Sequence, residues 1–171
     1  DPENPTVDRP TGEEGELIVR GPQVFSGYWH KPDETAEVFV PSSDGGKDWF
    51  RTGDIVRIDA DGFVTIVDRI KELIITGGFN VAPSEVEEAL RAHPDVADVA
   101  VVGLPSEHSG EDVVAVVVLA PGKQLDADGI RAFARESLTA YKVPKRVVAV
   151  DELPKSLIGK VLRRKVRDSL L

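Results

Sequence analysis

Alternating apolar and polar positions along residues 54–68 predict a β-hairpin. Residues 55–59 alternate between the two faces of a strand, Asp61–Gly62 is a dipeptide typical of tight turns, and residues 63–68 supply the returning strand. Residues 16–20 form an earlier apolar stretch that ends at a Gly-Pro pair, which predicts a further strand. The first part of the chain is therefore expected to be rich in β-structure.

From residue 73 on, the hydrophobic pattern mixes strands with helices. Ser84 followed by Glu87 three residues later is a capping box, which predicts a helix that ends before Pro94. The other expected elements are an apolar run at 73–75, strands at 96–104, 113–119 and 146–150, a helix with Ile130, Phe133, Ala134 and Leu138 at helical spacing, and a final helix at 161–171. This β-α-β-β-α-β-α order predicts a compact α+β domain of about 100 residues.

The composition is that of a globular chain. Of 171 residues, 41% are hydrophobic and 30% charged, which is not the profile of a disordered or fibrous protein. The absence of cysteine excludes disulfides, thiolate metal sites and cysteine nucleophiles, and agrees with an expected cytoplasmic location. The longest apolar run, residues 113–120, is far shorter than the ~20 residues of a membrane helix. Because the chain lacks methionine and begins at Asp1, we expect it to be a piece of a longer protein.

The net charge of −9 is unevenly distributed. Residues 1–68 hold 15 acidic and 6 basic side chains, whereas residues 69–171 hold 15 of each. An acidic front half argues against nucleic acid as a partner. The tail between Leu153 and Arg167 is basic and contains no acidic residue. Taken alone, such a run fits a solvated helix face, an anion site or, least well, a nucleic-acid patch.

Searches for common site motifs find none. The sequence has no GxxxxGK[ST] phosphate loop, no GxGxxG after a predicted strand and no HExxH. Gly159–Lys160 resembles the end of a phosphate loop, but Val161 follows where that motif needs Ser or Thr. The three histidines are isolated from one another, so we predict no metal ligand in this chain.

An ordered set of segments nevertheless resembles a known superfamily. The segments are Pro22–Trp29, Trp49–Asp54 (WFRTGD), Asp68–Glu72 (DRIKE), Ile75–Asn80 (ITGGFN), Val81–Glu87, Tyr141–Lys145 and Leu153–Arg164 (LPKSLIGKVLRR). In this order and spacing they resemble the C-terminal part of the adenylate-forming enzymes, which include acyl-CoA synthetases, adenylation domains of peptide synthetases and luciferases. Within that superfamily the chain is most similar to long-chain fatty-acid–CoA ligases, and the resemblance covers essentially the whole chain.

The resemblance implies a division of the chain into three parts. Residues 1–68 would be the C-terminal end of the large N-terminal AMP-binding domain, with hairpin or barrel strands. Residues 69–71 would be a hinge, and residues 72–171 would be the small, mobile C-terminal AMP-binding enzyme domain. The expected fold class is α+β, with a β-rich part followed by this domain.

Two residues are implied to bind the nucleotide. Asp54 would contact the ribose, because an ionised carboxylate offers two acceptor oxygens to a diol. Arg69 would contact ribose or phosphate through its fork of donors. Each also has a plain alternative: Asp54 as a turn residue after Gly53, and Arg69 as the ion-pair partner of Asp68 on the hairpin surface.

Four further residues are implied to serve catalysis, the hinge and CoA. Lys160 would be the catalytic lysine, whose ammonium group stabilises the negative charge that builds when a carboxylate attacks the α-phosphate of ATP. Lys71 would be the hinge residue, and Gly77 and Gly78 would form a wall of the tunnel that admits CoA. Their plain alternatives are solvated lysines for the first two and an ordinary strand-ending turn for the glycines.

The implied activity is that of an acid–thiol ligase in fatty acid metabolism. The intact enzyme would convert a fatty acid or another carboxylate and ATP to acyl-AMP, with Mg²⁺ held by residues upstream of this chain, and CoA would then displace AMP. This chain alone is expected to be inactive. The alternatives are an aryl or short-chain acid–CoA ligase, a fatty-acyl-AMP ligase that loads a carrier protein, and a non-catalytic module. A peripheral membrane contact and a homodimer of the full-length enzyme also stay open.

Overall fold

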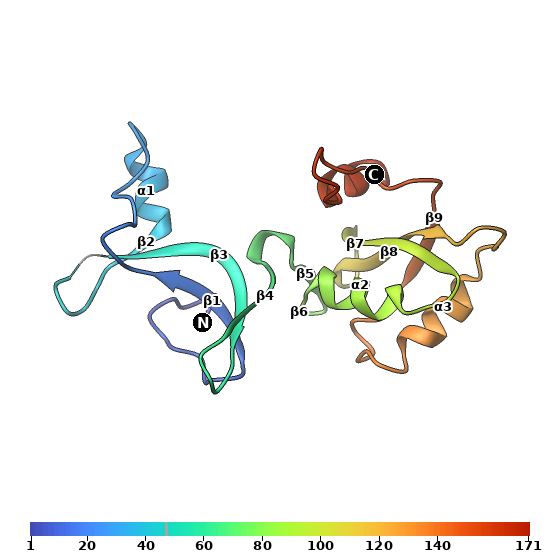
Figure 1. Ribbon diagram of the computed structural model, residues 1–171, viewed down its shortest axis with the longest axis horizontal. Coiled ribbons are helices and arrows are strands. Elements are labelled where there is room, and N and C mark those ends of the chain that lie inside the picture. The colour runs from blue at the N-terminus through green and yellow to red at the C-terminus, as the bar shows by residue number, and fades with distance from the viewer. Residues whose placement is uncertain (47) are drawn as a thin grey trace. The chain divides into compact units, whose positions relative to one another are not determined.

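The structure, a computed structural model, describes residues 1–46 and 48–171. The chain divides into two compact units, Asp1–Lys71 and Glu72–Leu171. Figure 1 shows the elements of each unit in chain order. The boundary between the units lies inside a short 3₁₀ helix, η1 (Ile70–Glu72).

The first unit is built on one antiparallel sheet. Its strands are β1 (Glu14–Val19), β2 (Phe39–Val40), β3 (Trp49–Ile58) and β4 (Val64–Arg69), and the helix α1 (Pro32–Val38) precedes β2. The long strand β3 pairs with each of the other three strands. Among the described residues this sheet does not close into a barrel.

The β3–β4 pair confirms the predicted hairpin, although β3 begins at Trp49, five residues before the predicted start. The extra residues pair with β1 and β2, and such long-range pairing leaves no signal in local alternation. Helix α1 was not predicted. It is short and buries no side chain, so it lacks the apolar stripe by which a helix is recognised.

The second unit is built on a five-stranded sheet, and helices cover both faces of this sheet. Its elements are β5 (Ile74–Thr76), β6 (Phe79–Val81), α2 (Pro83–Arg91), β7 (Val96–Ser106), β8 (Gly110–Leu119), α3 (Ala127–Ala134), β9 (Arg146–Ala149) and α4 (Arg163–Asp168). The strand order is β6-β5-β8-β7, and β9 pairs with β8 in parallel. This arrangement confirms the predicted α+β class.

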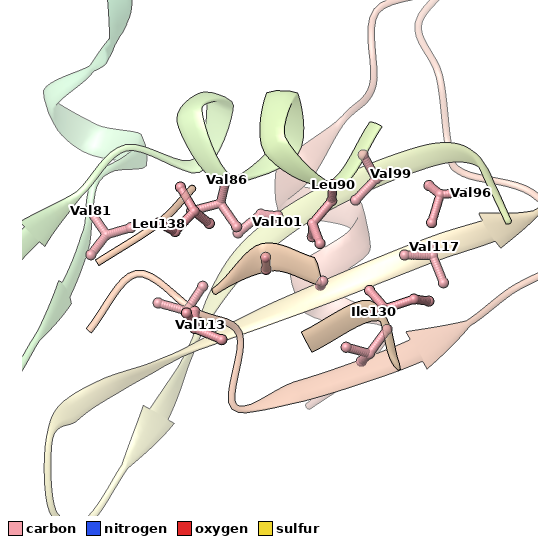
Figure 2. Packing of buried hydrophobic residues seen from close by; sticks show 14 of the residues in the cluster. Val81, Val86, Leu90, Val96, Val99, Val101, Val113, Val117, Ile130 and Leu138 are labelled. Carbon is pink, nitrogen blue, oxygen red and sulfur yellow. The ribbon is translucent and has the colours of Figure 1, made fainter. Parts of the chain in front are cut away.

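Two apolar clusters cover the two faces of this sheet. One joins the strands to α2 and α3 through residues such as Val86, Leu90 and Ile130, as Figure 2 shows. The other joins the alternate side chains of β7 and β8 to Leu153 and, through Val166, to α4. Because both faces are covered, β7 and β8 are nearly continuous runs of apolar residues rather than alternating ones.

The predicted capping box at Ser84 and Glu87 is wrong. The helix begins one residue earlier, at Pro83, with Ala82 at the N-cap, and no side chain caps it. Proline is well suited to this first position because its missing N–H has no partner in a helix anyway. The carboxylate of Glu87 instead accepts a hydrogen bond from the Val101 backbone N–H, 2.9 Å away.

The final helix is shorter than the predicted 161–171 and comprises Arg163–Asp168. The residues before it form a small hairpin, described below with the candidate site. None of the helices in the described part of the chain is long and apolar enough to cross a membrane.

Candidate functional site

Asp54 and Arg69 lie opposite each other on β3 and β4. The Nε atom of Arg69 is 2.9 Å from Oδ1 of Asp54. The Asp54 side chain is 21% exposed and the Arg69 side chain 63%, so the pair opens to solvent on the guanidinium side. The arrangement presents an acceptor carboxylate and a donor fork side by side, which suits a ligand that carries both hydroxyls and phosphate oxygens.

A bulge in β3 positions Asp54. Three residues of β3, Thr52 to Asp54, face the single residue Leu17 of β1, and Gly53 has a φ of +72°. The Thr52 hydroxyl donates to the Leu17 carbonyl (2.8 Å) and accepts from the Asp54 N–H (3.1 Å). These bonds stabilise the backbone just before the carboxylate.

The side chain of Glu16 stabilises the same bulge. It is only 3% exposed and accepts hydrogen bonds from Arg51 at 2.6 and 2.9 Å. Its other oxygen accepts from the Gly53 N–H at 3.2 Å. A buried carboxylate with a charged partner and a backbone donor is a rigid support for the residues beside it.

The sequence also allowed an ion pair between Arg69 and Asp68. In the structure, Asp68 and Asp54 contact different groups of Arg69. Asp68 is buried, and its carboxylate accepts a hydrogen bond from the backbone N–H of Arg69 at 2.8 Å. The guanidinium group pairs with Asp54. Asp54 and Arg69 are therefore the two predicted site residues that the fold brings into contact.

Lys71 is exposed and is the last residue of the first unit. It occupies the middle of η1. The residue that follows, Glu72, begins the second unit and pairs with Arg163.

Gly77 and Gly78 form the two-residue turn between β5 and β6. Their φ angles are +58° and +82°, as a type I′ turn requires, and glycine adopts these angles without steric cost. A methyl group added at either position would meet nothing within 4 Å. The backbone here is open to a ligand, and next to it Phe79 stacks on Tyr141 with ring centroids 4.4 Å apart.

Lys160 lies on the hairpin formed by residues 154–162, hereafter the Lys160 hairpin. Its base is closed by the bond from the Leu162 N–H to the Pro154 carbonyl (2.8 Å), and Lys155 pairs with Val161. A turn at its tip has Gly159 at φ +80°. Two hydrogen bonds join the backbone of Lys160 to Ser156: the Lys160 carbonyl accepts from the Ser156 N–H, and the Lys160 N–H donates to the Ser156 hydroxyl. The side chain of Lys160 is exposed.

Most other cations of the basic tail are neutralised by ion pairs. Lys155 pairs with Asp98 at 2.7 Å, and Arg167 pairs with Glu111 at 3.1 Å. Arg163 pairs with Glu87, at 2.7 Å, and with Glu72. Within residues 1–46 and 48–171, the ammonium group of Lys160 has no ion pair, so it is available to an anionic ligand.

Sequence reasoning missed the cluster of Arg163, Glu72 and Glu87. In the sequence Arg163 is one of several cations of the basic tail, and its partners lie 76 and 91 residues away in the chain. The sequence signal that could have found it is a glutamate inside an apolar helix face, since a buried carboxylate needs a charged partner.

A second polar cluster lies behind the Gly77–Gly78 turn. The Gly77 N–H donates to the Ser109 carbonyl at 2.8 Å. Hydrogen bonds from Lys145 and from the Ser109 hydroxyl, both 2.6 Å long, lower the pKa of the Asp112 carboxyl below its usual value. In the described residues, no group of three His, Cys, Asp or Glu side chains is placed to hold a metal ion.

Comparison with known families and proteins finds relatives that match most of this chain. Residues 85–160 match the family described as "AMP-binding enzyme C-terminal domain". A long-chain-fatty-acid–CoA ligase of Escherichia coli O6:H1 is 48% identical over 159 residues, which are 93% of this chain and 27% of that ligase. A feruloyl-CoA synthase of Amycolatopsis is 46% identical over 158 residues, 92% of this chain and 31% of the relative. The chain spans about a quarter of the length of the first of these relatives.

Solved structures give the same picture. The ATP-bound crystal structure of MatB from Rhodopseudomonas palustris matches with a TM-score of 0.84 and 40% identity over 94% of this chain and 31% of that one. The apo structure of the same protein matches over the same shares with a TM-score of 0.65.

Proposed function

On the premise that the chain belongs to the adenylate-forming enzymes, whose AMP-binding C-terminal domain it carries, we propose that it is part of a long-chain fatty-acid–CoA ligase. The observation that supports this most is the 48% identity to such a ligase across 93% of the chain. The proposed substrates are a fatty acid, ATP and CoA, and the proposed location is the cytoplasm, where both ATP and CoA are available.

In the first half-reaction a carboxylate oxygen attacks the α-phosphate of ATP, and pyrophosphate leaves. Negative charge grows on the transferred phosphate and on the leaving pyrophosphate. The unpaired ammonium of Lys160 would stabilise that charge and hold carboxylate and phosphate together. The hydrogen bonds that hold the backbone of Lys160 in its hairpin support this role, because a stabilising charge is effective only where it is already in place.

Asp54 and Arg69 would hold the nucleotide during that step. Asp54 accepts hydrogen bonds from the ribose hydroxyls, and Arg69 donates to ribose or phosphate oxygens. The 2.9 Å ion pair between them orients the carboxylate before the ligand arrives. Mg²⁺ bound with ATP would neutralise phosphate charge, and the described residues offer no group of ligands for it.

In the second half-reaction the CoA thiol attacks the acyl carbonyl, and AMP leaves. The open Gly77–Gly78 turn would admit the pantetheine arm of CoA, because no side chain projects from it. The two steps need different groups at one acyl-adenylate site, so we propose that the unit beginning at Glu72 rotates about Lys71 between them.

The test is a substrate panel with the full-length protein. Carboxylates of increasing chain length, together with ferulate and other aryl acids, would be supplied with ATP, with and without CoA, and AMP and thioester would both be measured. We expect thioester to form with long-chain acids. Preference for aryl acids would instead favour the alternative to which the 46% identical feruloyl-CoA synthase points. AMP without thioester would favour a ligase that loads a carrier protein. If neither AMP nor thioester formed, that result would contradict a catalytic function.

A further inference from the structure

Arg163 joins three distant parts of the second unit. It is the first residue of α4, directly after the base of the Lys160 hairpin. Its Nε and Nη2 atoms contact the two oxygens of Glu87 on α2, at 2.8 and 2.7 Å. Its Nη1 atom contacts the carboxylate of Glu72, the residue that begins the unit. One guanidinium group thus serves both Glu72 and Glu87.

Burial makes these contacts mutually dependent. The Arg163 side chain is 20% exposed and that of Glu87 only 9%, and Glu87 also accepts from the Val101 N–H. Without the guanidinium group, the nearly buried carboxylate of Glu87 would lose its charged partner, whereas Glu72, whose side chain is 35% exposed, would stay partly solvated. A charge at such a site is stable only when it is paired. The planar fork of arginine can span both glutamates, whereas a lysine cannot bond both in the same bidentate way.

We propose that Arg163 is a positioning residue for Lys160. It ties the base of the Lys160 hairpin to Glu72, so that the hairpin moves as one body with the first residue after the hinge. Glu87, which lies on α2 and accepts a hydrogen bond from Val101 of β7, fixes the guanidinium group, and Glu72 is the link to the hinge side. This inference rests on the proposed catalytic role of Lys160 and on the proposed rotation about Lys71.

The link matters because Lys160 has to return to the same place in every cycle. Its own side chain makes no ion pair in the described structure that would hold it. A misplacement of about 1 Å can cost about 10²-fold in rate, so the attachment of the hairpin to the hinge side would set the efficiency of the first half-reaction. The second half-reaction does not use Lys160 and would not depend on the link.

The test uses the full-length enzyme and the variant Glu72→Gln, which keeps the shape of the side chain but removes its charge. The Glu87 contact remains, so we expect an unfolding temperature close to that of the wild type. The kcat of adenylate formation should fall by about tenfold, with an unchanged KM for ATP. Thioester formation from supplied acyl-adenylate should keep its rate. Arg167→Gln is the matched control, because it removes an ion pair of the same helix α4 that does not reach the hinge; it should leave both rates unchanged.

A second variant and a double variant complete the test. Arg163→Lys should show the same selective loss, because it keeps the charge but not the fork. In the Lys160→Ala background, Glu72→Gln should cause no further loss, since both changes act through one residue. A wild-type rate for Glu72→Gln, equal losses in both half-reactions, or a full further loss in the double variant would overturn the positioning role. If Lys160→Ala itself forms adenylate normally, the proposed function fails instead.

Discussion

Arg69 and Asp54 form an ion pair across β3 and β4 with 2.9 Å between Nε and Oδ1. The bulge of β3 at Gly53 aims the carboxylate toward its partner, and the Thr52 hydroxyl supports the backbone beside it. The pair is prepared before any ligand binds, which lowers the ordering cost of binding. A prepared acceptor–donor pair at the end of a hairpin is the feature that makes the first unit a candidate nucleotide site.

Asp54→Ala in the full-length enzyme should weaken ATP binding. The lost ribose contacts are hydrogen bonds to a charged group, which contribute about 1.5–3 kcal/mol in total binding free energy. Calorimetry with ATP would measure the change. The control is Glu14→Gln, which removes another cross-strand ion pair of the same sheet, that with Arg57 at 2.7 Å, and should leave ATP affinity unchanged. Unchanged affinity in Asp54→Ala would contradict the ribose role.

The sequence could place Asp54 and Arg69 at one end of a hairpin, but not in contact. Contact depends on the register, and β3 and β4 contain a bulge between Ile55 and Val56 that no local pattern announces. A shift by one residue would turn the side chains to the opposite face. The ordered motifs therefore indicated which residues matter, whereas the pairing came from the fold.

In the second unit, too, local sequence patterns predicted the strands but not the long-range contacts. The valine-rich runs of β7 and β8 made their strands predictable, because both faces of the sheet are covered. The capping box failed because Pro83 begins the helix and Glu87 serves a long-range partner. The role of Arg163 could not be predicted, since its ion pairs join residues that are far apart in sequence.

Lys160→Ala should reduce the rate of adenylate formation by ~10²–10³-fold, as loss of one preorganised charge stabiliser does. Thioester formation from supplied acyl-adenylate should survive, because Lys160 is proposed to serve only the first step. Pyrophosphate release and thioester yield would measure the two half-reactions. Lys165→Ala is the control: this lysine is also exposed in the basic tail, and its removal should leave both rates intact. An equal fall in both half-reactions would contradict the assignment to adenylation.

Gly78→Ala should raise the KM for CoA and leave adenylate formation unchanged. The φ of +82° will cost an alanine about 1–2 kcal/mol in stability. The new methyl group meets no protein atom within 4 Å, so any further effect comes from the ligand. Gly122→Ala is matched in strain, with a φ of +77° and the same empty surroundings, and should lose stability without affecting CoA. Identical kinetics for the two variants would argue against a CoA tunnel at this turn.

Asp112 should make the chain less stable in acid. Hydrogen bonds from Lys145 and Ser109 lower the pKa of this carboxyl in the folded state below its ordinary 3.8. The stabilisation is complete above that ordinary value and is lost as the pH falls through the lower folded pKa. Thermal unfolding should show Asp112→Asn less stable than wild type at pH 6, with the gap shrinking toward pH 2. For exposed Asp128→Asn, little difference is expected at any pH; a constant gap for Asp112→Asn would contradict the linkage.

Lys71→Pro tests the hinge. Lys71 is exposed and ends the first unit, while the Glu72 that follows belongs to the second unit through Arg163. Between these two residues the backbone has to absorb any rotation, and a few torsions suffice for that. Proline fixes φ near about −65° and restricts the residue before it, so it blocks rotation without removing a packed side chain.

We therefore expect Lys71→Pro to keep one half-reaction, adenylate formation, and to lose much of thioester formation. A φ near −65° is compatible with the 3₁₀ helix at position 71, but proline disfavours a helical conformation of Ile70 before it, so we expect a small fall in the unfolding temperature and an otherwise unchanged fold. Lys71→Ala removes the same side chain but leaves the torsions free, and it should support both half-reactions at rates close to wild type. Small and equal effects of the two variants on both half-reactions would show that the pivot lies elsewhere.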